Sequence, residues 1–198
     1  MPQKPSFNEP VRKIYVSWVP NSIWDSTVAW VNLLEKAFGA ADYDEAGREI
    51  TVFFPRIDST AGSVIQVEQR DQLSDATDLL VVGTSDYINI HKQKINSGES
   101  TELLFFVEKR DSGAHQELIL WIAPLDKSLD KLKLSRSRFV PGKKLSDILG
   151  WHWLRNSRFP QPGGKNNPEQ IAIARDAIHE AIDKILGHIE SCEDCAYE

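Results

Sequence analysis

The chain has 198 residues, of which 41% are hydrophobic and 26% charged, and this size and composition fit one soluble globular domain. Its net charge of -6 argues against broad, sequence-independent binding of nucleic acid, which requires a basic surface. Lysine and arginine gather only over Lys127–Lys144, which is either a local basic patch or a solvated loop. No apolar run approaches the roughly 20 residues of a membrane helix, and Met1–Pro10 is polar, so we expect a cytoplasmic protein that makes no membrane contact.

Strand-like runs alternate with helical or mixed polar segments along the chain. Runs rich in β-branched and aromatic residues predict strands at Arg12–Trp18, Ile50–Phe54, Asp78–Thr84 and Leu118–Ala123, with a short fifth strand at Phe139–Val140. Apolar residues at helical spacing predict a helix that begins at Asp25 or Ser26 and ends at Gly39. The same spacing predicts helices over Ser63–Asp75, Gly98–Arg110 and Leu145–Trp153. A last helix is predicted from Pro168 onward, with Asn167 as its N-cap. The segment Ile88–Ser97 is ambiguous.

The central parts of these strands are mostly apolar, which is typical of a parallel sheet covered by helices on both faces. We therefore expect an α/β fold in one domain over residues 11–190, with a flexible lead-in at 1–10 and a flexible tail at 191–198. Ligands of such sheets bind beyond the carboxyl ends of the strands, so this edge is where a site is expected.

Four segments, in order, resemble the Toll/interleukin-1 receptor (TIR) domain family. Lys13–Trp18 is similar to the first strand of that family, and Val52–Asp58 with Gly62 is similar to its second strand and the loop after it. Asp75–Tyr87 is similar to the third strand and the turn that follows, and Ser100–Leu103 is similar to a helix start that carries a Glu-Leu pair. Trp151–Trp153 is similar to the aromatic motif before the last helix of the family. The resemblance implies a flavodoxin-like three-layer sandwich with about five parallel strands in the order 2-1-3-4-5.

The resemblance also implies a chemistry. Many TIR domains of bacteria and plants cleave NAD at the bond between nicotinamide and ribose, while others are adaptors that assemble without catalysis. The catalytic glutamate of the active members corresponds to Glu102. A carboxylate held beneath the ribose can stabilise the oxocarbenium-like transition state, and nicotinamide leaves readily without a strong general acid. Glu102 is equally placed to satisfy the dipole of its own helix, and Glu99 and, less favourably, Glu108 compete for the catalytic role.

The residues expected around the substrate are Ser17, Trp18, Arg56, Asp58 and Tyr87. Arg56 suits a pyrophosphate and Asp58 a ribose hydroxyl, although an exposed salt bridge or a helix cap accounts for them equally well. Ser17 either donates to the ligand or fixes the turn after its strand. Many catalytic relatives carry Trp four residues before the glutamate, where this chain has Gly98, so stacking would fall to Trp18, Trp24 or Tyr87, each of which also suits ordinary packing.

The sequence contains no glycine-rich phosphate-binding motif, which argues against a Rossmann dehydrogenase or a P-loop enzyme. The resemblance implies that NAD is a substrate, and we expect no bound cofactor. His188, Cys192 and Cys195 make half of a zinc site, with no fourth ligand nearby, and a tail of reduced thiols explains them more simply. No metal is therefore expected.

Three functions remain open on the sequence. The first is an NAD+ nucleosidase of bacterial defence or signalling, activated by self-association in which the loop Arg56–Gly62 completes a neighbouring site. An upstream sensor or a nucleotide signal is a further expected partner. The second is a non-catalytic TIR module that signals by homotypic assembly. The third is a flavodoxin-like enzyme acting on a nucleoside or a cyclic nucleotide. Whether cleavage would give linear or cyclic ADP-ribose is not encoded in any motif.

Overall fold

A computed structural model describes residues 11–19, 25–39, 48–55, 67–97, 101–111, 119–124, 131–136, 138–148, 151–154 and 168–187. Within them a five-stranded parallel sheet has the order β2-β1-β3-β4-β7. These strands are β2 (Ile50–Phe53), β1 (Arg12–Ser17), β3 (Asp78–Gly83), β4 (Ile119–Pro124) and β7 (Trp151–Trp153). The predicted flavodoxin-like α/β class is confirmed, and each of the first four strands lies within one residue of its expected ends.

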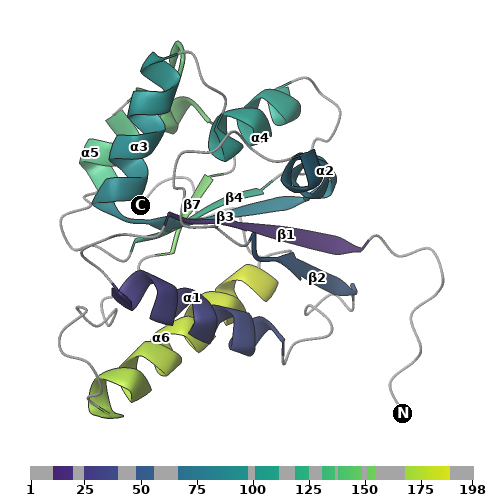
Figure 1. The fold of residues 1–198 in the computed structure, drawn as a ribbon, viewed down its shortest axis with the longest axis vertical. Coiled ribbons are helices and arrows are strands. Elements are labelled where there is room, and N and C mark those ends of the chain that lie inside the picture. The colour runs from purple at the N-terminus through teal and green to yellow at the C-terminus, as the bar shows by residue number, and fades with distance from the viewer. Residues whose placement is uncertain are drawn as a thin grey trace.

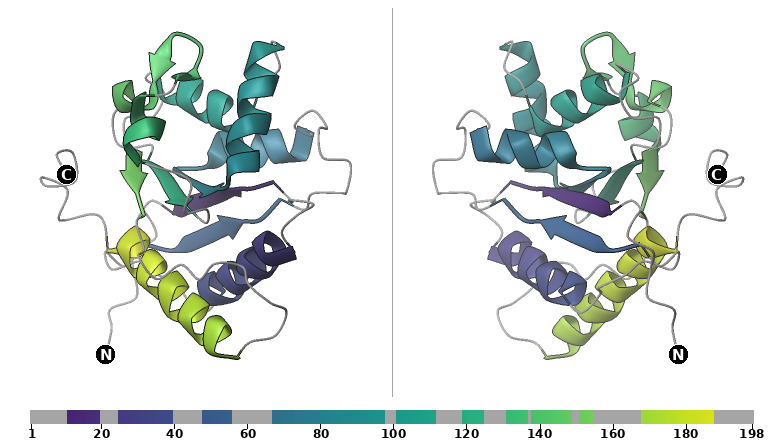
Figure 2. Two further views of the ribbon diagram at one scale, coloured as in Figure 1. Left: turned by 90° about the vertical axis from the view of Figure 1, so that its left-hand side faces the viewer. Right: turned by 90° about the vertical axis from the view of Figure 1, so that its right-hand side faces the viewer.

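Helices cover both faces of the sheet (Figure 1). On one face lie α1 (Asp25–Phe38) and α6 (Pro168–Leu186), and on the other lie α2 (Val67–Asp75), α3 (Ser85–Asn96), α4 (Glu102–Asp111) and α5 (Lys131–Arg136), as the side views in Figure 2 show. Among the described residues, no helix is long and apolar enough to cross a membrane.

Alternation along each strand divides the core between the two faces. Ile14 and Val16 of β1 pack with Leu34 of α1 and Ile182 of α6. The residue between them, Tyr15, belongs to the opposite cluster. That second cluster contains residues from α2, α3 and α4, namely Leu73, Tyr87, Ile88, Leu103, Phe106 and Val107. Strand β1 therefore presents odd-numbered residues to α3 and α4 and even-numbered residues to α1 and α6.

The prediction for the fifth strand was wrong in its residues. Phe139–Val140 falls in β5 (Arg138–Val140), which pairs antiparallel with β6 (Lys143–Lys144) and lies outside the main sheet. Between them Gly142 has φ of 81°, a value that a residue with a side chain rarely adopts. The fifth strand of the sheet is β7, within a segment predicted to be helical.

Other elements differ from expectation in length or in type. The ambiguous segment Ile88–Ser97 belongs to helix α3, so two helices separate β3 from β4, and Glu102 begins the second of them. In the basic stretch Lys127–Lys144, the described residues form α5 and the β5–β6 hairpin, not a loop. In the expected helix over Leu145–Trp153, the described residues form a 3₁₀ turn at Leu145–Asp147 and strand β7.

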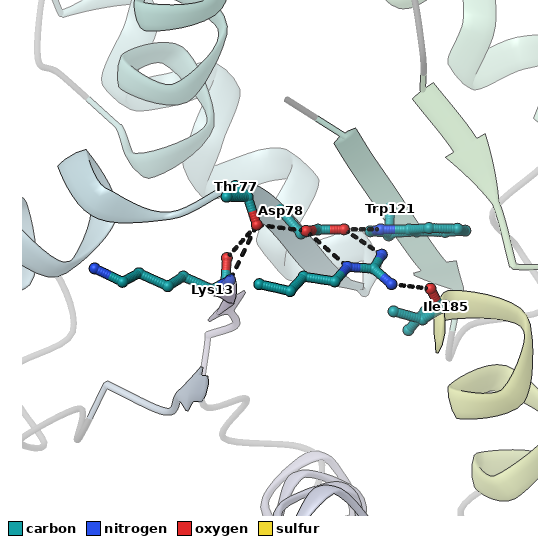
Figure 3. Close-up of polar contacts among 6 residues, drawn as sticks. Lys13, Thr77, Asp78, Trp121 and Ile185 are labelled. Atoms are coloured by element: carbon teal, nitrogen blue, oxygen red, sulfur yellow. Dashed lines mark hydrogen bonds and ion pairs between the residues drawn. The ribbon is translucent and has the colours of Figure 1, made fainter. Parts of the chain in front are cut away.

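A buried ion pair fastens the amino-terminal edge of the sheet to α6 (Figure 3). The guanidinium of Arg12 donates to both carboxylate oxygens of Asp78, from Nε at 3.1 Å and from Nη2 at 2.6 Å. The Nη1 atom of Arg12 donates to the carbonyl of Ile185 near the end of α6, at 2.6 Å. Asp78 also accepts from the indole of Trp121 at 2.9 Å and from the hydroxyl of Thr77 at 2.7 Å. The fold is thus anchored at the edge opposite the one where a site is expected.

Candidate functional site

Glu102 is the first residue of α4, and both ends of that helix are fixed. Before it, the hydroxyl of Thr101 accepts a hydrogen bond from the backbone N–H of Leu104 at 3.1 Å, which is the usual arrangement of an N-cap. Near the other end, Lys109 donates to the carbonyls of Ser74 and Ala76, where α2 ends. The carboxylate of Glu102 is therefore carried by a helix that has little freedom to shift.

Two hydroxyl groups from β1 hold the Glu102 carboxylate. The phenol of Tyr15 donates to Oε1 at 2.8 Å, and the hydroxyl of Ser17 donates to Oε2. Tyr15 and Ser17 are two residues apart on one strand, so both side chains point to the face that α4 covers. Because a carboxylate that accepts at both oxygens has no proton to donate, this arrangement fits the ionised form of Glu102.

Tyr87 extends this group of residues to α3. Its hydroxyl lies 2.8 Å from Oγ of Ser17, and since the Ser17 proton is directed at Glu102, the Tyr87 hydroxyl is the donor of this second bond. Thr84 caps α3 by accepting from the backbone N–H of Tyr87 at 3.1 Å, which fixes the tyrosine in the first turn. We call Tyr15, Ser17, Tyr87 and Glu102 the carboxylate cluster.

Burial dominates the electrostatics of the carboxylate cluster. It raises the pKa of Glu102 above the ordinary range, while the hydrogen bonds from Ser17 and Tyr15 and the positive charge of Lys94 on α3 act in the opposite direction. Burial also raises the pKa of Tyr15 and of Tyr87, and the negative charge of Glu102 raises both further. At neutral pH both phenols are therefore neutral hydrogen-bond donors.

Three of the residues expected at the site lie together, and one does not. Ser17, Tyr87 and Glu102 are members of the carboxylate cluster. Trp18 is the next residue after Ser17, and its half-buried ring packs against the core cluster shared with α1 and α6. Its indole Nε1 is buried and has no hydrogen-bond partner within the described ranges. Trp18 therefore does not face Glu102 across one cleft.

Other expectations fall outside the described residues. These are Arg56, Asp58 and the loop Arg56–Gly62, the alternatives Trp24 and Glu99, the position Gly98, and the half zinc site His188, Cys192 and Cys195. In the part of the chain that the structure describes, no three His, Cys, Asp or Glu side chains are grouped as metal ligands.

Sequence reasoning missed Tyr15 as a partner of Glu102. Because the run around Tyr15 is apolar, the pattern predicted only that this residue forms part of a strand. The signal was nevertheless present, since a tyrosine two residues before Ser17 must share its face of the sheet. A fully buried tyrosine usually finds a partner for its hydroxyl, and here the partner is the candidate catalytic carboxylate.

The fold and the carboxylate cluster can be set against known proteins. No known protein family matches this chain, and neither curated proteins nor solved structures give a match. What can be said of the class therefore comes from the chain itself: an α/β protein of flavodoxin-like topology with a half-buried glutamate at the carboxyl edge of its sheet.

Proposed function

We propose that this protein is a TIR-like NAD+ nucleosidase, which cleaves the bond between nicotinamide and ribose. The observation that carries the proposal is the position of Glu102, half-buried at the start of α4 and bonded to the last residue of β1. Parallel sheets bind ligands at this edge, and the family resemblance of the sequence puts its single catalytic residue at the same position.

The reaction requires little besides this carboxylate. As the glycosidic bond breaks, both bonding electrons leave with the nicotinamide nitrogen, which loses its positive charge, and positive charge develops on the ribose. A carboxylate held beneath the sugar stabilises that charge, as in glycoside hydrolysis. Water then adds to the anomeric carbon and releases a proton, giving ADP-ribose. Attack by an internal nucleophile instead of water would give a cyclic product.

The wider setting belongs to the same proposal. It comprises a cytoplasmic protein of bacterial defence or signalling, activated by self-association through TIR surfaces or by an upstream sensor or nucleotide signal. Such activation would explain how a resting protein spares cellular NAD+. NAD+ is the substrate here, and no separate cofactor is part of the proposal.

The test compares two glutamines on one helix. Glu102→Gln removes the charge but keeps the shape, and Glu108→Gln is its matched control, because Glu108 is exposed and lies almost two turns farther along α4. With concentrated protein and NAD+, nicotinamide release should fall by about 100-fold or more in Glu102→Gln and stay within about twofold in Glu108→Gln. Equal turnover in the two variants would remove Glu102 from the mechanism. Absence of turnover in every assembled state of the wild type would end the enzyme proposal.

A second function, the non-catalytic TIR module, is favoured by one feature of the cluster. Both oxygens of Glu102 already accept hydrogen bonds from protein hydroxyls, as expected for a carboxylate that stabilises the fold. The location of Trp18 on the other face of the sheet points the same way, because it takes away one expected stacking partner. This alternative predicts concentration-dependent self-association in analytical ultracentrifugation, unchanged by Glu102→Gln and without NAD+ consumption.

A further inference from the structure

The two oxygens of Glu102 are held in different ways. Oε2 accepts a hydrogen bond from the hydroxyl of Ser17 on β1, and the oxygen of that hydroxyl accepts one from Tyr87 on α3. The position of Oε2 therefore depends on a chain of two hydrogen bonds. Oε1 accepts directly from Tyr15, at 2.8 Å. Tyr15 is thus a single rigid support on one side of the carboxylate, and it comes from the central part of a strand.

We propose that Tyr15 is a positioning residue for Glu102, whose hydroxyl fixes the orientation of the carboxylate and favours its ionised form. This residue would act through Glu102 and need not touch the substrate. The kinetic part of the inference rests on the proposed nucleosidase function, whereas the hydrogen bond and its effect on Glu102 do not.

The packing of Tyr15 makes it suited to this task. Its side chain is fully buried, and it belongs to the same core cluster as Leu103 and Phe106, which flank Glu102 on α4. The ring therefore has no room to leave its rotamer, and its hydroxyl is delivered to one point. Phenylalanine would fill the same space, so the specific contribution of tyrosine at this position is the hydrogen bond to Glu102.

Among the described residues, β1 and α3 contribute the charges and titratable groups that act on Glu102. From β1 they are the hydroxyls of Tyr15 and Ser17, and from α3 they are the phenol of Tyr87 and the ammonium of Lys94. Burial raises the pKa of Glu102, and the bonds from Ser17 and Tyr15 oppose that rise. A donor to the charged form favours that form, so loss of the Tyr15 hydroxyl should raise the pKa of Glu102 further.

The experiment is a carbon NMR titration of the Glu102 carboxyl group in full-length, ligand-free protein. It compares wild type with Tyr15→Phe and with Tyr87→Phe, which removes an equivalent hydroxyl that reaches Glu102 only through Ser17. We expect the titration midpoint to rise in Tyr15→Phe, and to rise less in Tyr87→Phe. An unchanged or lowered midpoint in Tyr15→Phe, or a larger rise in Tyr87→Phe, would overturn the proposal.

A kinetic measurement supplies the second arm. In Tyr15→Phe, kcat/KM for NAD+ should fall about tenfold on the acidic limb of the pH profile and recover toward alkaline pH, because deprotonation restores the carboxylate. A loss of the same size at all pH values would show that the Tyr15 hydroxyl does not favour the ionised form of Glu102, and would overturn the proposal. If no variant, nor the wild type, cleaves NAD+, the nucleosidase function fails while the titration still decides the role of Tyr15.

A reciprocal measurement keeps the inference testable if Tyr15→Phe does not fold. In Glu102→Gln, the Tyr15 hydroxyl loses its charged acceptor, so its proton should exchange with water faster and its ring carbon signals should move. Equal exchange rates and unmoved signals in the two proteins would show that the bond has no measurable strength and would overturn the proposal.

Discussion

Removing Arg12 is the sharpest test of how this fold is held together. The side chains of Arg12 and Asp78 are 1% and 2% exposed, so both charges are shielded from water. Arg12→Met keeps most of the apolar stem but takes away two donors from Asp78 and the donor to the carbonyl of Ile185. The carboxylate of Asp78 would remain buried, with only Trp121 and Thr77 as donors among the contacts described above.

The expected cost follows from that geometry. Breaking a buried ion pair by removing one partner costs about 3–5 kcal/mol, because an uncompensated charge stays behind. For a chain of this length, each kcal/mol lowers the melting temperature by about 2–4 °C, so Arg12→Met should melt roughly 6–20 °C lower than wild type. Arg12→Met with Asp78→Leu removes both charges, and it should cost about 1–3 kcal/mol less than the sum of the single substitutions.

The neighbouring residue provides a matched control. Lys13 pairs with Asp75 at 3.1 Å, but these side chains are 34% and 65% exposed. Lys13→Met should therefore cost no more than about 1 kcal/mol. Urea unfolding followed by circular dichroism, together with thermal melts, measures the stability of Arg12→Met, Asp78→Leu, the double variant and Lys13→Met. The reasoning is refuted if Arg12→Met costs no more than Lys13→Met, or if the two substitutions at the buried pair are simply additive.

Three smaller effects follow from the helix cap and the raised pKa values. Thr101→Ala should destabilise the protein by about 1 kcal/mol in urea unfolding, because the N–H of Leu104 loses its acceptor, and Thr101→Ser should restore most of that loss. Burial raises the pKa of Glu102 in the folded state, so stability that is present at acid pH is lost as the pH rises through the folded-state pKa. Relative to wild type, Glu102→Gln should gain stability as the pH rises above the ordinary pKa of a glutamate, about 4.3, and a flat or falling difference in melting temperature would contradict this. The pKa of Tyr87 is raised as well, so its contribution is lost above about pH 10, and Tyr87→Phe should show a shallower alkaline loss of stability than wild type.

The first four strands could be predicted because each contains a run rich in β-branched and other apolar residues, and the clearest, Leu79–Val82, is buried throughout. The fifth could not, because Trp151–Trp153 is only three residues long and contains a histidine. It becomes a strand through pairing with β4, where His152 lies opposite Trp121. That pairing is a tertiary contact, and local propensity carries little information about it.

The candidate site was predictable in its carboxylate and less so in its surroundings. Glu102 was found from family resemblance and helix position, and Ser17 and Tyr87 were named as ligand-binding residues. In the structure the hydroxyls of Ser17 and Tyr87 bond to the protein itself. For Trp18 the structure shows the packing role that was left open beside stacking, because a strand turns each successive side chain to the opposite face. The buried Arg12–Asp78 pair was missed altogether, although a charged residue at the start of each of two buried strands was a visible sign of it.

The carboxylates of Asp78 and Glu102 lie at opposite edges of one sheet and accept hydrogen bonds from different kinds of donor. At the amino edge, Asp78 has Arg12, Trp121 and Thr77 as donors and is closed to water, so it stabilises and has no free position for a ligand. At the carboxyl edge, the donors to Glu102 among the described residues are the neutral hydroxyls of Tyr15 and Ser17, and the residue is half-buried. Sugar hydroxyls are donors of the same kind, so a ribose could take the place of the Ser17 hydroxyl while Tyr15 keeps its bond to Glu102. A carboxylate paired with arginine could not make that exchange, and for this reason the proposed chemistry is assigned to Glu102 and not to Asp78.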